Sequence, residues 1–241
     1  MERADILRDL VIRGSDTDPA RCAEIAADLG LLTSDILAVA GHPVPANLLP
    51  PERGARVVKE FAYRASHCNH AQMAALMDFI HRLPVVPTES SPPPALGQKV
   101  YARPDAGRLA TAFDGLMRNR GFGPRELPFM GLSLSTIHGI LGRDRHDEHR
   151  WFQLSNIAGP LGWRFEDLVA VTDEPPSARP RYAMHCHHLG QLYVEAIRLT
   201  EGQLIEVAEQ ADRLSERPEQ GAWRPVGQGF AMECPELADL A

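Results

Sequence analysis

A sharp turn between two short helices is the pattern that most constrains the fold of this chain, and it lies within residues 125–168. Gly131 can adopt the positive φ that ends one helix, and Ser133 can cap the next by accepting an unpaired backbone N–H. An apolar stripe at helical spacing follows, formed by Ile137, Ile140 and Leu141. The stripe predicts a helix that buries one face and presents small polar side chains on the others.

The helical pattern continues downstream and carries a family resemblance. An apolar rhythm of 3.6 residues runs from Leu154 to Leu161, Gly162 can end it, and a further short helix follows. This order of helices resembles the Cro/C1-type (Xre-like) helix-turn-helix family over residues 108–172. The run LSNIAGPLGWRFEDL is similar to that family's last two helices. The chain departs from the family where Pro128 interrupts the second helix and where the third ends one residue early.

The resemblance implies a DNA-reading role for residues 124–142. The helix that starts at Ser133 would lie in the major groove of double-stranded DNA. The side chains nearest the base edges would be Leu134, Ser135, Thr136 and His138. Leu134 can touch a thymine methyl group, and the hydroxyl groups can donate or accept hydrogen bonds.

Positive charge is concentrated in the same region. Residues 108–150 carry seven arginines against five acidic residues, whereas the whole chain has a net charge of −7 and both ends are acidic. Acidic ends repel DNA and favour contact through the central segment. Phosphate contacts are predicted for Arg125, Arg143 and Arg145. Arg118 and Arg120 are interpreted either as further phosphate contacts or as a solvated helix end.

The N-terminal segment contains a degenerate copy of the central pattern. Five positions match residues 101 further along the chain: Gly30, Leu31, Ser34, Ile36 and Gly41. We interpret the two segments as a tandem repeat. The helix at 34–40 is mostly apolar and carries Asp35 where a phosphate would approach. Its face therefore suits protein contact better than DNA.

Proline-rich breaks at 84–105 and 173–180 divide the chain. They predict an all-α fold with a degenerate helix-turn-helix-like domain at 1–83, a linker at 84–105, a Cro/C1-like domain at 106–172 and a C-terminal helical extension at 181–241. Outside the central domain, helices are predicted over 52–64, 69–83, 184–198 and from 200 onward, with Asn69 and Gln72 forming a capping box.

A single reading helix buries too little surface for tight binding, so a homodimer is expected. The candidate dimer or partner surfaces are the apolar stripe of residues 200–215, which is favoured, and the apolar face of 36–40. Each of the two can instead be core within its own segment.

Other function classes lack their signatures. The four cysteines are scattered, no signal peptide is present and no apolar window reaches 18 residues, so the protein is predicted to be cytoplasmic without membrane contact. No catalytic motif or cofactor-binding loop is found, and neither an enzyme nor a cofactor is predicted. The runs 67–70 and 185–188 contain histidine and cysteine, but adjacent residues on a helix diverge, so no metal site is predicted.

The sequence therefore predicts a sequence-specific DNA-binding transcriptional regulator. The alternative is a protein-interaction module that keeps the helix-turn-helix scaffold without binding DNA.

Overall fold

The computed structural model describes residues 2–51, 53–86, 100–102, 107–125, 127, 134–142, 157–159, 161–172 and 184–215. Within these ranges the chain is all-helical, with ten α-helices, two short 3-10 helices and no strand. The predicted all-α class is confirmed for this part of the chain. None of the described helices is both long and apolar enough to cross a membrane.

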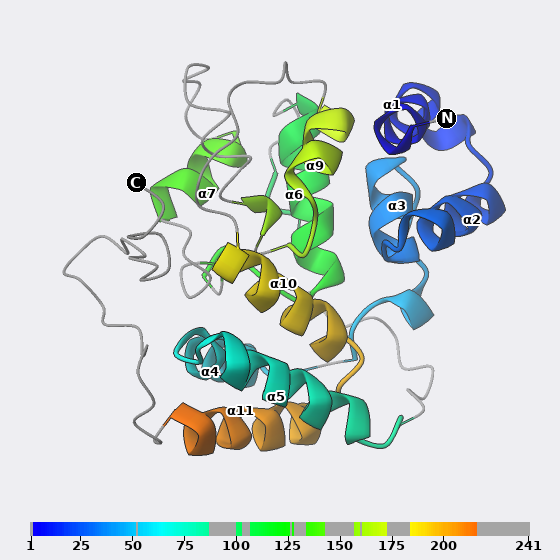
Figure 1. Cartoon of the computed structure of the whole chain (residues 1–241). Helices are drawn as coiled ribbons and strands as arrows, with labels where there is room; N and C mark the ends of the chain where they lie inside the picture. The colour runs from blue at the N-terminus through cyan, green and yellow to red at the C-terminus, as the bar shows by residue number, and fades with distance from the viewer. Residues whose placement is uncertain are drawn as a thin grey trace, which may run out of the picture.

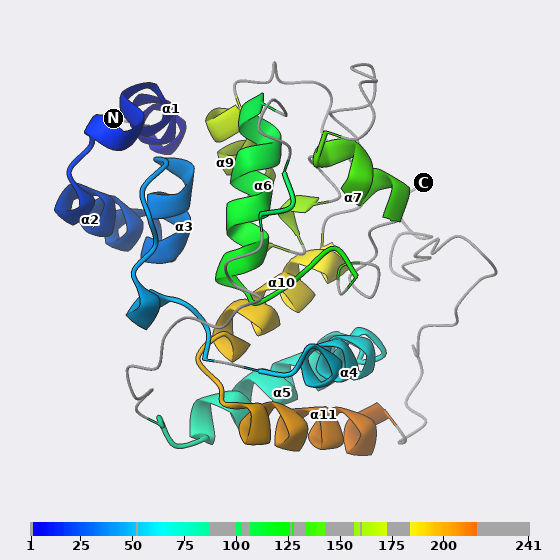
Figure 2. The same ribbon diagram turned by 180° about the vertical axis from the view of Figure 1, so that it is seen from behind.

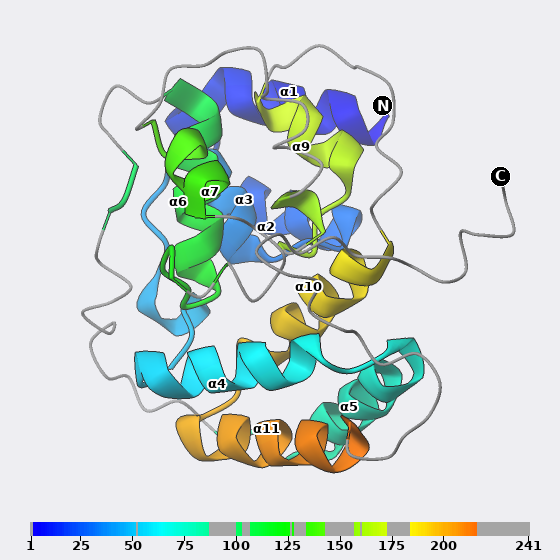
Figure 3. The same ribbon diagram turned by 90° about the vertical axis from the view of Figure 1, so that its left-hand side faces the viewer.

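The helices form two groups (Figure 1). The lower group contains α4 (Ala55–Ser66), α5 (His70–Arg82) and α11 (Glu201–Ser215), with α10 (Met184–Ala196) lying across it toward the upper group (Figure 3). The upper group contains α1 (Arg3–Arg13), α2 (Pro19–Leu29), α3 (Thr33–Val39), α6 (Gly107–Asn119), α7 (Leu134–Ile140) and α9 (Phe165–Thr172). The 3-10 helices span Gly14–Asp16 and Ala46–Leu48.

The start of α5 confirms the predicted capping box. The Asn69 side chain accepts a hydrogen bond from the Gln72 backbone N–H (2.9 Å), and the Gln72 side chain accepts one from the Asn69 backbone N–H (2.7 Å). These reciprocal bonds satisfy two of the donors that the first turn of a helix leaves unpaired. The apolar stripe of α5 is buried at Met73, Leu76 and Ile80, which pack toward α10 and α11.

Helix α4 begins later than predicted, because Arg53 points into the protein. Its guanidinium donates to the backbone oxygens of Ala196 (3.1 Å) and Arg120 (3.2 Å). These oxygens lie at the C-terminal ends of α10 and α6, where helix dipoles place partial negative charge. Burial lowers the pKa of Arg53 to about 10, which still leaves the side chain charged at neutral pH. The chain therefore enters α4 only after Gly54.

The two apolar faces considered as dimer or partner surfaces lie in the interior. On α11, the stripe of Leu204, Val207, Ala208 and Ala211 is at most 3% exposed, and α11 packs against α4 and α5. On α3, Ile36 and Leu37 are buried on the core side. The preference for residues 200–215 as a dimer surface is therefore wrong for this structure, because each face finds its apolar partner within the same chain.

In the upper group, α6 stands between α3 and α7. Figure 1 and the reverse view in Figure 2 both place these two helices on opposite sides of α6. The N-terminal helix α1 packs on α9. Helices from predicted segment 1–83 thus contact α6 and α9 of the predicted central domain. The predicted breaks at 84–105 and 173–180 fall mostly outside the described residues, and the domain boundaries stay a prediction.

Candidate nucleic-acid interface

Helix α7 is amphipathic, as its sequence predicts. Ile137 is fully buried, and Ile140 and Leu141 are 4% and 2% exposed. All three belong to the hydrophobic core, where α7 packs beside α6. A helix of seven residues is not stable alone in water, so this apolar stripe is what holds α7 in place.

The N-terminal end of α7 lies on the surface of the protein. Leu134 keeps 49% of its surface exposed, Ser135 is exposed and His138 is half-buried. Thr136 belongs to the same helix, but its side chain lies outside the described residues. In Figures 1 and 2, α7 is the helix of the upper group farthest from α1, α2 and α3. We therefore take the outward face of α7 as the candidate site.

The remaining predicted site residues are described only in part. Arg125 is exposed, whereas Ser133, Arg143 and Arg145 lie outside the described residues, so their roles stay predictions. The Nδ1 atom of His138 is buried and has no hydrogen-bond partner among the described residues.

Helices α3 and α7 correspond to each other by a shift of 101 residues, from 33–39 to 134–140. Each is followed by a glycine with positive φ: Gly41 at +79° and Gly142 at +86°. In both cases the glycine N–H bonds to the carbonyl oxygen three residues earlier at 3.1 Å. The two segments thus share their local geometry as well as their sequence pattern.

Helix α3 differs from α7 in turning its corresponding face inward. Ser34 is 4% exposed and Asp35 1%, and α3 packs on α6. The approach is so close that a Cβ atom added at Gly115 would lie 2.9 Å from the Ala38 Cβ. The expectation that this helix suits protein contact better than DNA agrees with the structure, since the contact is made within the chain.

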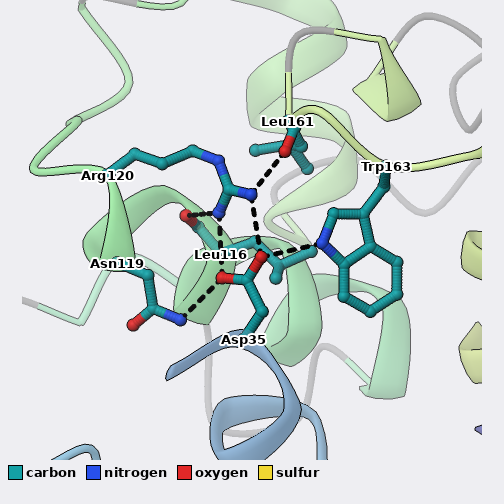
Figure 4. A network of polar contacts seen from close by, with 6 residues as sticks. All are labelled: Asp35, Leu116, Asn119, Arg120, Leu161 and Trp163. Atoms are coloured by element: carbon teal, nitrogen blue, oxygen red, sulfur yellow. Dashed lines mark hydrogen bonds and ion pairs between the residues drawn. The ribbon is translucent and has the colours of Figure 1, made fainter. Parts of the chain in front are cut away.

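Four side chains meet where α3 contacts α6, and we call them the Asp35 cluster: Asp35, Asn119, Arg120 and Trp163 (Figure 4). One carboxylate oxygen of Asp35, Oδ1, accepts from Asn119 Nδ2 (2.9 Å) and Arg120 Nη1 (3.0 Å). The other, Oδ2, accepts from Arg120 Nη2 (2.8 Å) and Trp163 Nε1 (2.8 Å). The Asp35 carboxylate therefore receives four hydrogen bonds from three different side chains.

The Asp35 cluster is suited to holding the fold and not to catalysis. Asp35 and Arg120 are 1% and 2% exposed. An ionised carboxylate has about four acceptor positions, and all of those on Asp35 are used. No lone pair is left for a substrate or a metal ion. Pairing and hydrogen bonding are what make a buried charge tolerable in a low-dielectric interior. The Asp35 carboxylate meets both conditions, and Arg120 does so through its two Nη atoms, while its buried Nε has no partner among the described residues.

The interpretation of Arg120 as a phosphate contact or a solvated helix end is wrong. Its side chain is buried and pairs with a carboxylate 85 residues away. Arg118 is 31% exposed and pairs with the buried Asp114 at 3.1 Å. The sequence shows that a helix ends here, but not that α3 brings Asp35 to it. A signal was present: one carboxylate in an otherwise apolar helix needs a buried cationic partner.

A second ion pair joins the N-terminal helices to the central ones. Arg3 of α1 donates from Nε and Nη2 to the carboxylate of Asp167 on α9, with both distances at 2.7 Å. The Asp167 side chain is 2% exposed. A third nitrogen of Arg3 donates to the backbone oxygen of Leu29 at the end of α2. This pair and the Asp35 cluster together hold the N-terminal helices against the central ones. The N-terminal helices supply the cation in the first and the anion in the second, and the central helices supply the partner in each.

The histidine and cysteine runs meet only in part. The rings of His70 on α5 and His188 on α10 lie edge to face with centroids 4.1 Å apart. Cys68 is buried, and desolvation raises the pKa of its thiol to about 12. The side chains of residues 185–187 lie outside the described part of the chain. The described residues contain no group of three or more metal-ligating side chains.

Comparisons of the chain with protein-family models, curated proteins and solved structures found no match. Among the described helices, α7 is the one that joins the predicted reading pattern to an exposed polar face.

Proposed function

We propose that this chain is a cytoplasmic, non-enzymatic, sequence-specific DNA-binding transcriptional regulator of Cro/C1 helix-turn-helix type, and that it reads DNA with α7. The observation that carries the proposal is the orientation of this helix. Ile137 and Ile140 anchor it in the core, while Leu134 and Ser135 are exposed at its N-terminal end. Reading helices of this class contact base edges with their N-terminal residues, and the exposure of this end of α7 supports the proposal.

Each exposed group on α7 suits a particular feature of the major groove. The Leu134 side chain can pack against a thymine methyl group, and the Ser135 hydroxyl can donate or accept a hydrogen bond at a base edge. His138 adds an N–H donor for an acceptor such as guanine O6 or N7. Thr136 and Ser133 are proposed as further contacts from the sequence pattern. The phosphate ligands proposed on the same basis are Arg125, Arg143 and Arg145.

The regulator is proposed to act as a homodimer on double-stranded DNA. One reading helix buries little surface, and paired helices about 34 Å apart meet successive major grooves on one side of the duplex. Because the apolar faces of α3 and α11 are used inside the chain, the dimer surface must lie elsewhere.

A protein-interaction module is the second candidate. It is favoured by the large exposed surface of Leu134, because apolar side chains on a helix face can anchor a protein partner, and by the net charge of −7, which opposes DNA. The two candidates differ in their salt dependence. DNA binding weakens steeply as salt rises because bound counterions are released, whereas an apolar protein contact does not.

Selection of bound duplexes from a random-sequence DNA pool tests the proposal directly. We expect recovery of a palindrome whose half-sites are centred about 10 base pairs apart, and an affinity that falls as salt rises. The double variant Arg143→Ala/Arg145→Ala should weaken binding to all sequences alike and reduce the slope of log affinity against log salt by about 2. Thr136→Ala should instead change the recovered sequence more than the overall affinity.

The matched control removes two exposed arginines far from α7 in the sequence. Arg8→Ala/Arg213→Ala changes the net charge by the same amount and should leave the salt slope nearly unchanged. Equal losses in the two double variants would show that affinity depends only on net charge and would reject the proposed phosphate contacts. Recovery of no enriched sequence from the pool would leave the protein-interaction module as the better candidate.

A further inference from the structure

Helix α7 lies on a stretch of chain whose two ends meet at the Asp35 cluster. The stretch runs from residue 121 to residue 160, between Arg120 at the end of α6 and the turn that precedes α9. Arg120 and Trp163 both bind the carboxylate of Asp35 (Figure 4). One side chain of the degenerate N-terminal copy therefore contacts the chain both before and after the proposed reading helix.

The upstream end is fixed by several contacts on Arg120. Its guanidinium donates to Asp35 and to the backbone oxygen of Leu116 (2.7 Å), and its own backbone oxygen accepts from Arg53. Gly121 follows with φ at +69° and turns the chain, and the N–H of Phe122 bonds back to α6. The start of the stretch is thus held by side-chain and backbone contacts together.

The downstream end is held through the same guanidinium. Arg120 Nη2 also donates to the backbone oxygen of Leu161, two residues before Trp163. This end packs closely against α10, since a Cβ atom added at Gly162 would lie 2.8 Å from Val194 Cγ2 and 3.3 Å from the Gly190 oxygen. The Asp35–Arg120 pair therefore joins the two ends of the stretch to each other as well as to α3.

We infer that Asp35 is a positioning residue for α7, so that the degenerate N-terminal copy sets the DNA-binding competence of the central one without touching DNA. The part of this inference that concerns DNA binding rests on the proposed function. The part that concerns the placement of α7 does not. Asp35 acts through Arg120 and Trp163, which carry its effect to the two ends of the stretch.

The physical reason is that, among the described residues, only a short apolar stripe holds α7 on the core. Of the described residues of α7 and the turn that follows it, three are deeply buried: Ile137, Ile140 and Leu141. Without the Asp35 carboxylate, Arg120 becomes a buried cation with only carbonyl oxygens as partners. Its free energy is then lower if the guanidinium moves toward water. Such movement releases both ends of the stretch at once. The fraction of molecules with α7 correctly placed then falls, and apparent DNA affinity falls in proportion.

The test compares Asp35→Asn with Leu204→Ala in the full-length chain. Asp35→Asn keeps the shape of the side chain and removes its charge. Leu204→Ala destabilises α11, which lies in the lower group and away from the Asp35 cluster. Both variants are studied well below their unfolding temperatures. The first readout is hydrogen exchange at the amides of Leu141 and Gly142, which bond to the carbonyl groups of α7. The second is affinity for a duplex recovered from the random pool.

We expect Asp35→Asn to speed exchange at those two amides and to weaken DNA binding, each by about tenfold. Leu204→Ala should speed exchange in α11 and leave the α7 amides and the DNA affinity within about twofold of the parent. A general loss of stability would instead affect both sets of amides alike, so equal responses in the two variants would overturn the inference. Unchanged exchange at α7 in a folded Asp35→Asn protein would overturn it as well.

A milder variant covers the case in which Asp35→Asn does not fold. Trp163→Phe keeps a buried ring and removes only the Nε1–H that binds Asp35, so it cuts the direct bond to the downstream end. We expect exchange at Leu141 and Gly142 to rise about threefold. No rise in that variant would count against the inference. A parent protein that selects no DNA would reject the proposed function, and the exchange results would still decide the positioning role.

Discussion

Helices α3 and α7 have the same length, each is followed by a glycine with positive φ, and the two are related by a constant shift in the sequence. They differ in whether the corresponding face is buried or exposed. On α3 that face is buried against α6, with Ser34 4% exposed and Asp35 1%. On α7 the residue equivalent to Ser34, Ser135, is exposed to solvent. The difference teaches that the shared sequence pattern specifies the local geometry of the helix and its closing turn, whereas the residues on the outer face decide what the helix contacts.

The chemistry of one position on α3 illustrates this division. Asp35 would repel a phosphate backbone, but it is a good partner for a buried arginine. Its equivalent on α7 is Thr136, a neutral residue. The interior helix thus carries a carboxylate at the position where the outward-facing helix has a neutral residue. Substitutions on the two helices measure how strongly each depends on its present environment.

Asp35→Ala is expected to have the largest effect on stability. It leaves the Arg120 guanidinium buried without its counterion, and breaking a buried ion pair in this way costs about 3–5 kcal/mol. Urea unfolding of the two proteins measures the loss. Adding Arg120→Met removes the uncompensated charge and should recover part of it. A loss below about 1 kcal/mol for Asp35→Ala would mean that the cluster contributes little to holding α3 on α6.

The same substitution at equivalent positions of the two helices gives the most direct contrast. Ser34→Arg places a cation on the buried face of α3 and is expected to cost on the order of 3 kcal/mol. Ser135→Arg, 101 residues later, places it on the exposed face of α7 and should change stability by about 0.5 kcal/mol or less. Thermal unfolding measures both. Similar losses at the two positions would contradict the difference in environment between the helices.

Gly115→Ala tests how tightly α3 packs on α6. The added methyl group would lie 2.9 Å from the Ala38 Cβ, and such overpacking costs about 1–3 kcal/mol. Alanine gains about 1 kcal/mol over glycine inside a helix, so a net loss of about 1 kcal/mol is expected. The loss should shrink when Ala38→Gly is present, and a double-mutant cycle measures that coupling. Additive effects would show that the helices can separate to make room.

The sequence was sufficient for features that depend on neighbouring residues. The capping box of Asn69 and Gln72 and the burial of Ile137 and Ile140 follow from short spacings along the chain. They could be predicted because a helix fixes which side chains share a face. The positive φ at Gly142 has a local cause of the same kind.

Contacts between distant segments could not be obtained in this way. The Asp35–Arg120 pair joins residues 85 apart, and the Arg3–Asp167 pair joins residues 164 apart. Spacing along the chain carries no information about such partners. The predicted dimer surface at residues 200–215 is wrong for the same reason, since an amphipathic helix does not reveal whether its apolar face is covered by its own chain.

Leu134→Ala is expected to have the smallest effect on folding and a specific effect on DNA. Leu134 is half exposed, so its truncation should change the free energy of unfolding by about 0.5 kcal/mol or less. If its side chain packs on a thymine methyl group, losing that burial should weaken binding by about 1 kcal/mol, or roughly fivefold. Ile205→Ala is the matched control, because Ile205 is 43% exposed on α11.

Filter binding is measured on a recovered duplex and on the same duplex with uracil in place of thymine. The comparison isolates the contact between Leu134 and the thymine methyl group. Uracil lacks the C5 methyl group, so the parent protein should lose about as much affinity on that duplex as Leu134→Ala loses on the normal one. The variant should lose nothing further on the uracil duplex. If the two losses add, Leu134 does not touch the thymine methyl group. Its exposure on α7 would then favour a protein partner over the groove of DNA.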